Sequence, residues 1–139
     1  MPSSLDQKCA IVISESLPTG LAVNAASVLA VSLGANVEGI VGDDVKDSDG
    51  VTHSGVIFIP LPVLRHSTEG IAALLQSAAA DDELFVYTFS SLAQSCKTYD
   101  EYIERMGATP TRDVEVVGVT LYGPKKKMNK LVGSLPLLR

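Results

Sequence analysis

The hydrophobic positions of the chain follow two patterns, short continuous apolar runs and longer stretches with helical spacing. A short continuous run is typical of a strand that is buried on both faces of a sheet. Apolar residues three and four positions apart are typical of one face of a helix. We predict helices over residues 18–33, from 67 to about 78, and over 90–106. We predict strands at 8–14, 37–41, 55–59, 83–89 and 113–122.

Residues with special backbone preferences mark the ends of these helices. Ser16 precedes the first helix and is expected to cap it, and Pro18 suits an early position that needs no backbone N–H. Gly34 is expected to end that helix, because glycine readily adopts the left-handed conformation found after a last turn. Ser67 is expected to cap the second helix, and Gly107 to end the third.

Strands that alternate with helices indicate an α/β fold. The length of 139 residues suits one domain with a sizeable core, so residues 1–139 are taken as a single α/β domain. We expect a compact three-layer sandwich with a mixed, mainly parallel sheet of about four or five strands. The polar segment 42–50 is expected to be a solvated hairpin loop that turns at Asp49-Gly50.

Charge is distributed unevenly along the chain. The net charge is −5, yet residues 116–139 carry five basic and no acidic side chains. An acidic total disfavours a general nucleic-acid binder, whose surface must neutralise many phosphates. The segment Met1–Lys8 lacks the order of a signal peptide, and no unbroken apolar run approaches the ~18 residues of a membrane span. We therefore expect a cytoplasmic protein that does not contact a membrane.

No metal or cofactor site is expected. Cys9 and Cys96 have no metal-binding or redox spacing, and Cys9 suits a small core residue. In an EF-hand alignment of the acidic loop, Val45 and Val56 occupy the two end positions that require carboxylates. The sequence also lacks the glycine-rich loops that cradle nucleotide phosphates, and no serine lies in a nucleophile elbow.

Two groups of residues are candidates for binding an anion. The first lies where the first helix follows a buried strand, the usual position of ligand sites in open α/β sheets. The second is the basic turn that follows the last strand, where a helix start would offer free N–H groups. The alternatives are a solvated surface for the lysines and a structural hydrogen bond for the asparagine. The candidate residues are Thr19, Gly20, Asn24, Gly123, Lys125 and Lys126.

Two segments resemble a known pattern: KCAIVISESLPTGLAVNAASVLA near the start and VVGVTLYGPKKKMNKLVGSLPLLR at the end. They are similar to a family of small, mostly bacterial proteins known only as a domain of unknown function. That family in turn resembles the type II peptidyl-tRNA hydrolases, whose fold surrounds a four-stranded mixed sheet. The Gly123-Pro124 turn and the tail 133–137 match the hydrolase pattern.

The chain departs from the hydrolase pattern at the residues that the resemblance would make functional. Residues 18–21 contain no lysine where the hydrolases have lysines that meet RNA phosphate. Residues 24–27 read Asn-Ala-Ala-Ser in place of a Gln-Cys-x-His run. Residues 107–113 retain an aspartate, an arginine and threonines, but not the order Asp-Ala-Gly-Arg-Thr. The resemblance therefore implies the fold more than the activity.

Three functions follow as hypotheses. The first is binding of a small anionic ligand near Thr19, Asn24 and the basic turn. The second is hydrolysis of an aminoacyl or peptidyl ester, with Asp113 or His53 as the base. The third is a homodimer formed through the apolar tail 132–138 and the first helix, which is rich in small residues.

Overall fold

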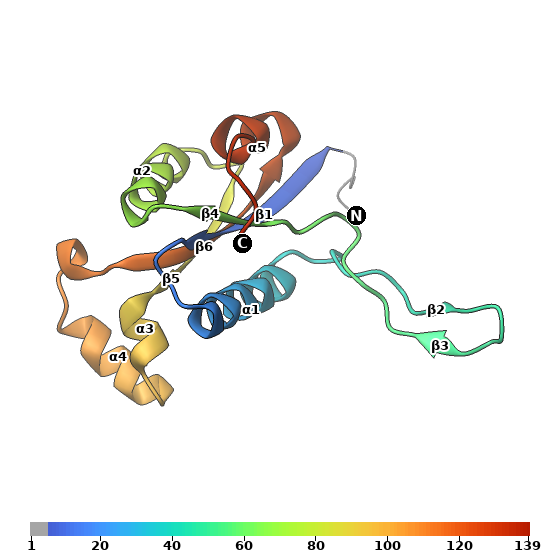
Figure 1. Cartoon of the computed structure of the whole chain (residues 1–139), viewed down its shortest axis with the longest axis horizontal. Coiled ribbons are helices and arrows are strands. Elements are labelled where there is room, and N and C mark those ends of the chain that lie inside the picture. Colours follow the sequence, from blue (N-terminus) through green and yellow to red (C-terminus); the bar gives the residue numbers. More distant parts are fainter. Residues whose placement is uncertain (1–5) are drawn as a thin grey trace.

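The computed structural model describes residues 6–139, and it forms a four-stranded sheet with helices on both faces (Figure 1). Residues 1–5, which carry most of the segment compared with a signal peptide, lie outside the described residues. The strands of the sheet lie in the order β4-β1-β6-β5. The elements are β1 (Gln7–Ser14), α1 (Thr19–Asn36), β2 (Val45–Lys46), β3 (Thr52–His53), β4 (Val63–His66), α2 (Thr68–Ala79), β5 (Phe85–Ser90), α3 (Ser91–Ser95), α4 (Tyr99–Gly107), the 3-10 turn η1 (Thr111–Asp113), β6 (Val116–Pro124) and α5 (Lys125–Val132).

The sheet is mixed, as predicted, but its pairing is not mainly parallel. β1 pairs with β4 in parallel and with β6 antiparallel, and β5 also pairs with β6 antiparallel. Three strands therefore point one way, and the reversed β6 lies between two of them. The prediction of mainly parallel pairing is wrong because it assumed that the helices between β5 and β6 cross the sheet.

The connection from β5 to β6 stays at one end of the sheet. The N–H of Ser91 donates to the carbonyl of Glu115 at 2.9 Å, so the end of β5 and the start of β6 are neighbours. The single helix predicted over 90–106 is two helices, α3 and α4. The second helix begins after Thr98, because the Thr98 hydroxyl accepts a hydrogen bond from the N–H of Glu101 and caps α4.

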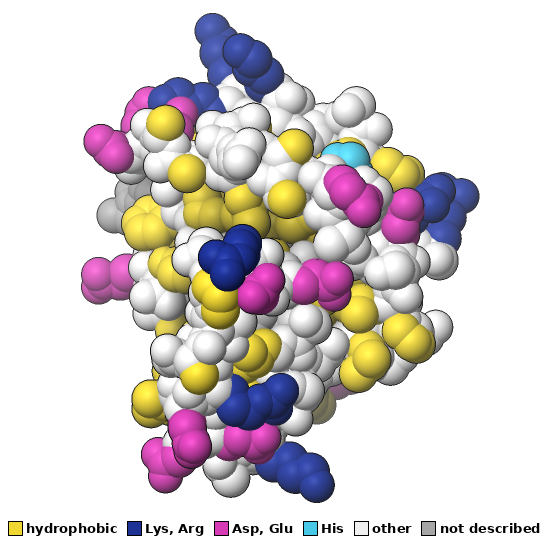
Figure 2. All heavy atoms as spheres, turned by 90° about the vertical axis from the view of Figure 1, so that its left-hand side faces the viewer, with side chains coloured by type: hydrophobic (Ala, Val, Ile, Leu, Met, Phe, Trp, Pro, Cys, Tyr) yellow, Lys and Arg dark blue, Asp and Glu magenta, His cyan; other side chains and the backbone are white. Residues whose placement is uncertain are grey.

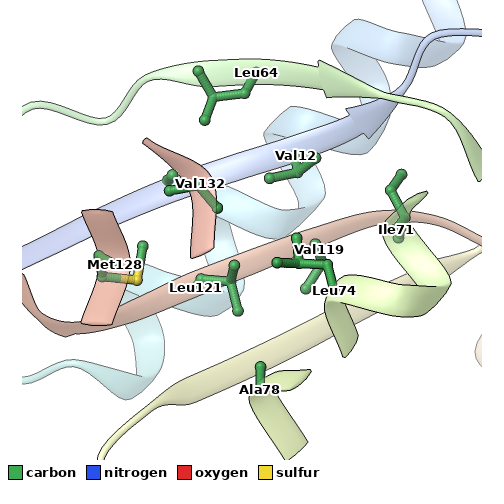
Figure 3. Close-up of a cluster of buried hydrophobic side chains, with 10 residues drawn as sticks. Val12, Leu64, Ile71, Leu74, Ala78, Val119, Leu121, Met128 and Val132 are labelled. Atoms are coloured by element: carbon green, nitrogen blue, oxygen red, sulfur yellow. The ribbon is translucent and has the colours of Figure 1, made fainter. Parts of the chain in front are cut away.

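β1 is buried on both faces, as its apolar run predicted. Alternate residues point to opposite sides of a strand. Ala10 and Val12 pack in a cluster with side chains of α2, α5 and β6 (Figure 3). Ile11 and Ile13 pack against α1 on the other face. The helices thus form two outer layers around the sheet, which confirms three layers.

The helix ends follow the sequence signals only in part. The Ser67 hydroxyl accepts from the N–H of Gly70, which confirms the predicted cap of α2. Ser16 is not the cap of α1: the N-cap residue is Pro18, and no side chain caps it. α1 also continues past Gly34 to Asn36, and the left-handed glycine lies further on, at Gly39 with φ of 76°.

Residues 40–58 form a hairpin arm that extends away from the body of the protein (Figure 1). The N–H of Phe58 donates to the carbonyl of Ile40 at its base, and β2 pairs with β3 further out. Within these described residues, the strands predicted at 37–41 and 55–59 do not form, and a single bridge joins Val41 to Ile57. The predicted turn at Asp49-Gly50 is confirmed, with φ of 84° at Gly50.

The C-terminal tail covers the β4 edge of the sheet. Leu137 bridges Leu64, and the N–H groups of Arg65 and Leu138 bond the carbonyls of Pro136 and Val63 at 2.9 Å. An unpaired strand edge offers a template for association with another chain. The tail supplies that pairing from within the chain, so the edge of β4 is not available to a partner.

We predict that Gly118→Ala destabilises the protein by about 1–3 kcal/mol, because the core is overpacked. A Cβ at this position would lie 2.8 Å from Leu29 Cδ1 and 3.0 Å from Ile13 Cδ1. Urea unfolding gives the free energy of unfolding. Gly107→Ala is the matched control, because a Cβ there meets nothing within 4 Å. Equal stability of the two variants would contradict the packing of α1 on β6.

We predict that the two thiols differ in reactivity. Cys9 is 3% exposed, as expected of a core residue, and burial raises its thiol pKa to about 11. Because the thiolate is the reactive form, Cys9 should react with Ellman's reagent at pH 8 at least ~100-fold more slowly than an ordinary thiol. Cys96 is half-buried and should react first. Fast reaction in a Cys96→Ser variant would contradict the burial of Cys9.

Candidate functional site

One end of the sheet gathers the features expected of a ligand site. β1, β4 and β5 all end there, and α1, α2 and α3 all begin there (Figure 1). Open α/β sheets usually bind ligands outside the carboxyl ends of their strands. Figure 2 shows this side of the molecule, with hydrophobic side chains on the floor of a hollow and charged side chains at its rim.

Three hydroxyl groups are linked at the centre of this end. The Ser14 hydroxyl, on a fully buried residue, lies 2.8 Å from the Ser16 hydroxyl and 2.9 Å from the Thr68 hydroxyl. A buried hydroxyl needs such partners, because an unpaired one costs stability. The chain joins the end of β1 to the first turn of α2. Ser16, expected to cap α1, is held in this chain instead.

A cavity of about 290 Å³ lies on the α1 side of the hydroxyl chain. Its polar lining includes Thr19 and Arg65. In the sheet, Arg65 is the register partner of Ile13, so its side chain lies on the face that α1 covers. The full lining is Glu15, Leu17, Thr19, Ala22, Val23, Arg65, Leu138 and Arg139.

Arg65 is only partly paired. Its Nη1 lies 3.7 Å from a carboxylate oxygen of Glu15, and both side chains are more than 40% exposed. Such an exposed and long ion pair contributes little. The Nε of Arg65 is shielded from solvent and has no hydrogen-bond acceptor among the described residues. A guanidinium with an unused N–H is suited to receive an anionic oxygen.

The first turn of α1 adds unpaired donors to the same cavity. No side chain caps the helix, and its first turn contains no acidic residue. The intrahelical ladder begins only where Ala22 N–H bonds the carbonyl of Pro18 at 2.9 Å. The preceding N–H groups, including those of Thr19 and Gly20, have no intrahelical partner. The partial positive charge of a helix start favours an anion at this position.

A second groove, of about 440 Å³, lies between α2 and the segment that leads into β6. Thr68, at one end of the hydroxyl chain, lines it on one side and Asp113 on the other. Asp113, a predicted candidate, therefore belongs to this end of the sheet. The lining is Thr68, Glu69, Ala72, Leu75, Arg112, Asp113, Val114, Glu115 and Val116.

The basic turn lies at the other end of the sheet. Pro124, just before Lys125, is the register partner of Gln7 at the start of β1, whereas α1 follows the end of β1. Seven residue steps of ~3.3 Å separate the two ends by roughly 23 Å. The structure therefore does not bring Gly123, Lys125 and Lys126 together with Thr19. α5 also covers the opposite face from α1.

The lysines of the basic turn have different surroundings. Lys125 and Lys126 are exposed, as expected if these lysines form a solvated surface. Lys127 forms ion pairs with Asp81, at 2.8 Å, and with Glu83. These carboxylates raise the pKa of Lys127, and Lys127 in turn holds the pKa of Asp81 below its usual value. The side chain of Lys127 thus ties α5 to the loop before β5.

The two other candidates serve local structure. Asn24 Oδ1 accepts from Nε2 of Gln94 at 3.1 Å, and the same amide donates to the carbonyl of Leu21 at 2.9 Å. This contact joins α3 to α1, so the structural alternative for Asn24 is the one that the geometry favours. His53 lies on the arm, 2.8 Å from the carboxylate of Asp47. The pair holds the pKa of Asp47 below its usual value.

Arg65, Ser14 and Thr68 were not among the site residues predicted from the sequence. Each lies at the end of a strand or the start of a helix, where the rule for open sheets places ligand sites. For Arg65 the rule would have applied if the short strand β4 had been predicted. β4 was missed because its pairing beside β1 could not be inferred from its four residues.

The described residues 6–139 contain no group of three or more histidine, cysteine, aspartate or glutamate side chains that could hold a metal ion. By length and composition, α1 would suffice to cross a membrane. A helix that covers a sheet can have the same composition, and α1 buries Ala22, Ala25, Leu29 and Leu33 against this sheet.

A family model described as "Protein of unknown function (DUF2000)" matches residues 7–139. The chain belongs to this family. The DUF2000 match spans every element of the structure, the hairpin arm and the tail included. No curated protein matches the chain.

A solved structure supports the fold of this DUF2000 chain. It is a protein of unknown function, Atu0240, from Agrobacterium tumefaciens strain C58. The two chains superpose with a TM-score of 0.83 at 17% identity, over 95% of this chain and 97% of the other. At this identity the likeness shows a shared fold. The finer resemblance to type II peptidyl-tRNA hydrolases stays a prediction.

Proposed function

We propose that this DUF2000 chain binds a small anionic ligand in the cavity at the start of α1. The observation that carries the proposal is the Nε of Arg65, which is shielded from water and without an acceptor beside an uncapped helix start. Both features are donors that lack acceptors within the described chain. A single carboxylate or phosphate would satisfy the two together.

The surroundings of Arg65 define the ligand further. The volume of about 290 Å³ suits a small molecule rather than a polymer. The charged side chains that line the cavity are Arg65, Arg139 and Glu15, two positive and one negative, so one anionic group is favoured. Leu17, Ala22 and Leu138 form apolar walls, which favour a carbon skeleton beside that group. A small carboxylate or phosphate monoester fits this description.

We predict that Arg65→Gln weakens binding of inorganic phosphate and of a short-chain carboxylate such as butyrate about 10- to 100-fold. Loss of a charged hydrogen bond costs about 1.5–3 kcal/mol. Isothermal titration calorimetry at low salt measures both probes. Lys125→Gln is the matched control, because it removes the same charge at the far end of β1. Equal weakening by both variants, or by the control alone, would reject the cavity at α1.

A second candidate function is hydrolysis of an acyl ester in the groove between α2 and the start of β6. Asp113 and Thr68 line the same groove, which supports a base and a hydroxyl acting on one substrate. The peptidyl-tRNA hydrolase resemblance suggested an ester of this class. His53, the other base considered, lies in β3 on the arm, which extends from the side of the molecule opposite to α2 and this groove (Figure 1).

We predict that any ester hydrolysis by this chain depends on Asp113 and not on His53. Removal of a general base lowers the rate by about 100- to 10,000-fold. Release of the acyl group from N-acetyl-phenylalanyl-tRNA is measured for the native chain, Asp113→Asn and His53→Ala. Absence of turnover by the native chain would reject the hydrolase, and equal turnover by all three would reject Asp113 as the base.

A further inference from the structure

Exposed apolar side chains are concentrated on α1 and the arm. Of the thirteen large hydrophobic residues that are exposed in the described chain, four lie on α1 and five on the arm. Single exposed hydrophobic residues are ordinary, but a contiguous group marks an interaction surface. The nine are Leu21, Val23, Val28, Val31, Val41, Val45, Val51, Val56 and Phe58.

The outward face of α1 has the character of a buried surface. None of the eighteen residues of the helix carries a charge. Val31 is 72% exposed and Val23 is 58% exposed. The helix does carry polar residues, such as Asn24, Ser27 and Ser32, but the outer face of a helix at a protein surface usually carries charged residues as well. Here the sheet covers one face, and the described residues leave the opposite face open to solvent.

The arm is held in shape by its own hydrogen bonds, although its apolar side chains are uncovered. Asp47 Oδ1 accepts from the N–H groups of Asp49 and Val51 at 3.0 Å, and its Oδ2 contacts His53. Val45 is the register partner of His53, so it lies on the same face as this pair. An isolated two-stranded hairpin is marginal in water. A preformed arm with exposed valines is suited to bind without a large ordering cost.

We propose that α1 and the arm together form the interface with a second copy of this chain. The arm leaves the body just beyond the end of α1, and it is about as long as the helix. Nine extended residue steps from Ile40 to Asp49 reach up to ~30 Å, and the eighteen residues of α1 span ~27 Å. In a two-fold dimer, each arm lies along the exposed face of its partner's α1.

The exposed apolar area agrees with what a stable dimer requires. Burial of one such side chain usually contributes ~1.5–3 kcal/mol of free energy. At ~25 cal/mol per Å², this corresponds to ~60–120 Å² of buried apolar area. Nine side chains, each about half exposed, therefore offer roughly 300–550 Å². A standard interface buries ~800 Å² per partner, of which ~65% is apolar in homodimers, or about 500 Å². Each chain carries both the exposed face of α1 and the arm. A symmetric dimer therefore covers both surfaces of both copies without another protein.

The charges argue for a protein partner over a lipid surface. Helices that lie on membranes carry basic residues on their polar face, and α1 has none. The arm adds Asp43, Asp44, Asp47 and Asp49 against one lysine, Lys46. Anionic lipid headgroups would repel this arm. The proposed interface meets the rim of the anion cavity at Val23, whereas Val31 and the arm do not line that cavity.

Sedimentation velocity over a range of concentrations tests the proposal. We expect a dimer for the native chain and a dissociation constant raised at least about tenfold by Val31→Lys and by Val51→Lys. Ile103→Lys is the matched control, since Ile103 is 59% exposed on α4. A native chain that stays monomeric at all concentrations overturns the proposal. So does a dimer that both interface variants leave unchanged.

Disulfide trapping tests the exchange of arms. In a Cys96→Ser background, one preparation carries Val31→Cys and the other Val51→Cys. We expect the mixture to form a disulfide-linked dimer faster than either preparation alone, because the arm of one copy contacts α1 of the other. A disulfide within one chain that carries both cysteines, at protein concentrations too low for dimers, would overturn the arm exchange.

A flotation assay with vesicles of phosphatidylcholine and phosphatidylserine distinguishes a lipid surface from a second copy. We expect the native chain to remain with the aqueous fraction. Flotation that Val31→Lys abolishes, together with a monomer in solution, would overturn the dimer and assign the apolar face to a membrane.

Discussion

The burial of β1 on both faces is the constraint on which the rest of the structure depends. β4 and β6 flank the strand, α1 covers one face, and α2 and α5 cover the other. A strand in that position needs apolar side chains at every residue, and residues 9–13 supply them. Because β1 ends at the buried Ser14, the first polar residues that follow it lie at the edge of the sheet. The candidate site begins at this point.

The reversal of β6 determines which residues share an end of the sheet. An antiparallel neighbour brings the start of β6 to the end of β1, so Asp113 lies near Thr68 and the hydroxyl chain. The same reversal carries the Gly123-Pro124 turn to the start of β1. The basic turn and the start of α1 both offer anions a helix terminus, but no single ligand of small size could contact both. Of these two helix starts, the start of α1 combines the terminus with a partly unpaired arginine and a cavity.

The sequence predicted the elements whose signals are local. The run at residues 8–14, the cap at Ser67 and the turn at Asp49-Gly50 depend on neighbouring residues, and all three are confirmed. The direction of β6 and the pairing of β4 beside β1 depend on contacts distant in sequence, and no local pattern specifies them. Arg65 was missed for this reason, since its position in the site comes from the register with Ile13. Asn24 stood out as a lone polar residue, but the Gln94 that bonds it is seventy residues away.

The composition of α1 has two explanations that the sequence could not separate. Small residues permit close packing on the sheet, and Ala22 and Ala25 are used in this way. The same reasoning does not explain Val28 and Val31, which remain exposed. A helix that only covers a sheet usually carries polar and charged residues on its outer face; α1 has polar ones, such as Asn24 and Ser27, but no charged residues. Their complete absence from eighteen residues is better explained by a second surface that packs on this face, and the arm, anchored at the end of the same helix, has the length and the apolar side chains to provide it.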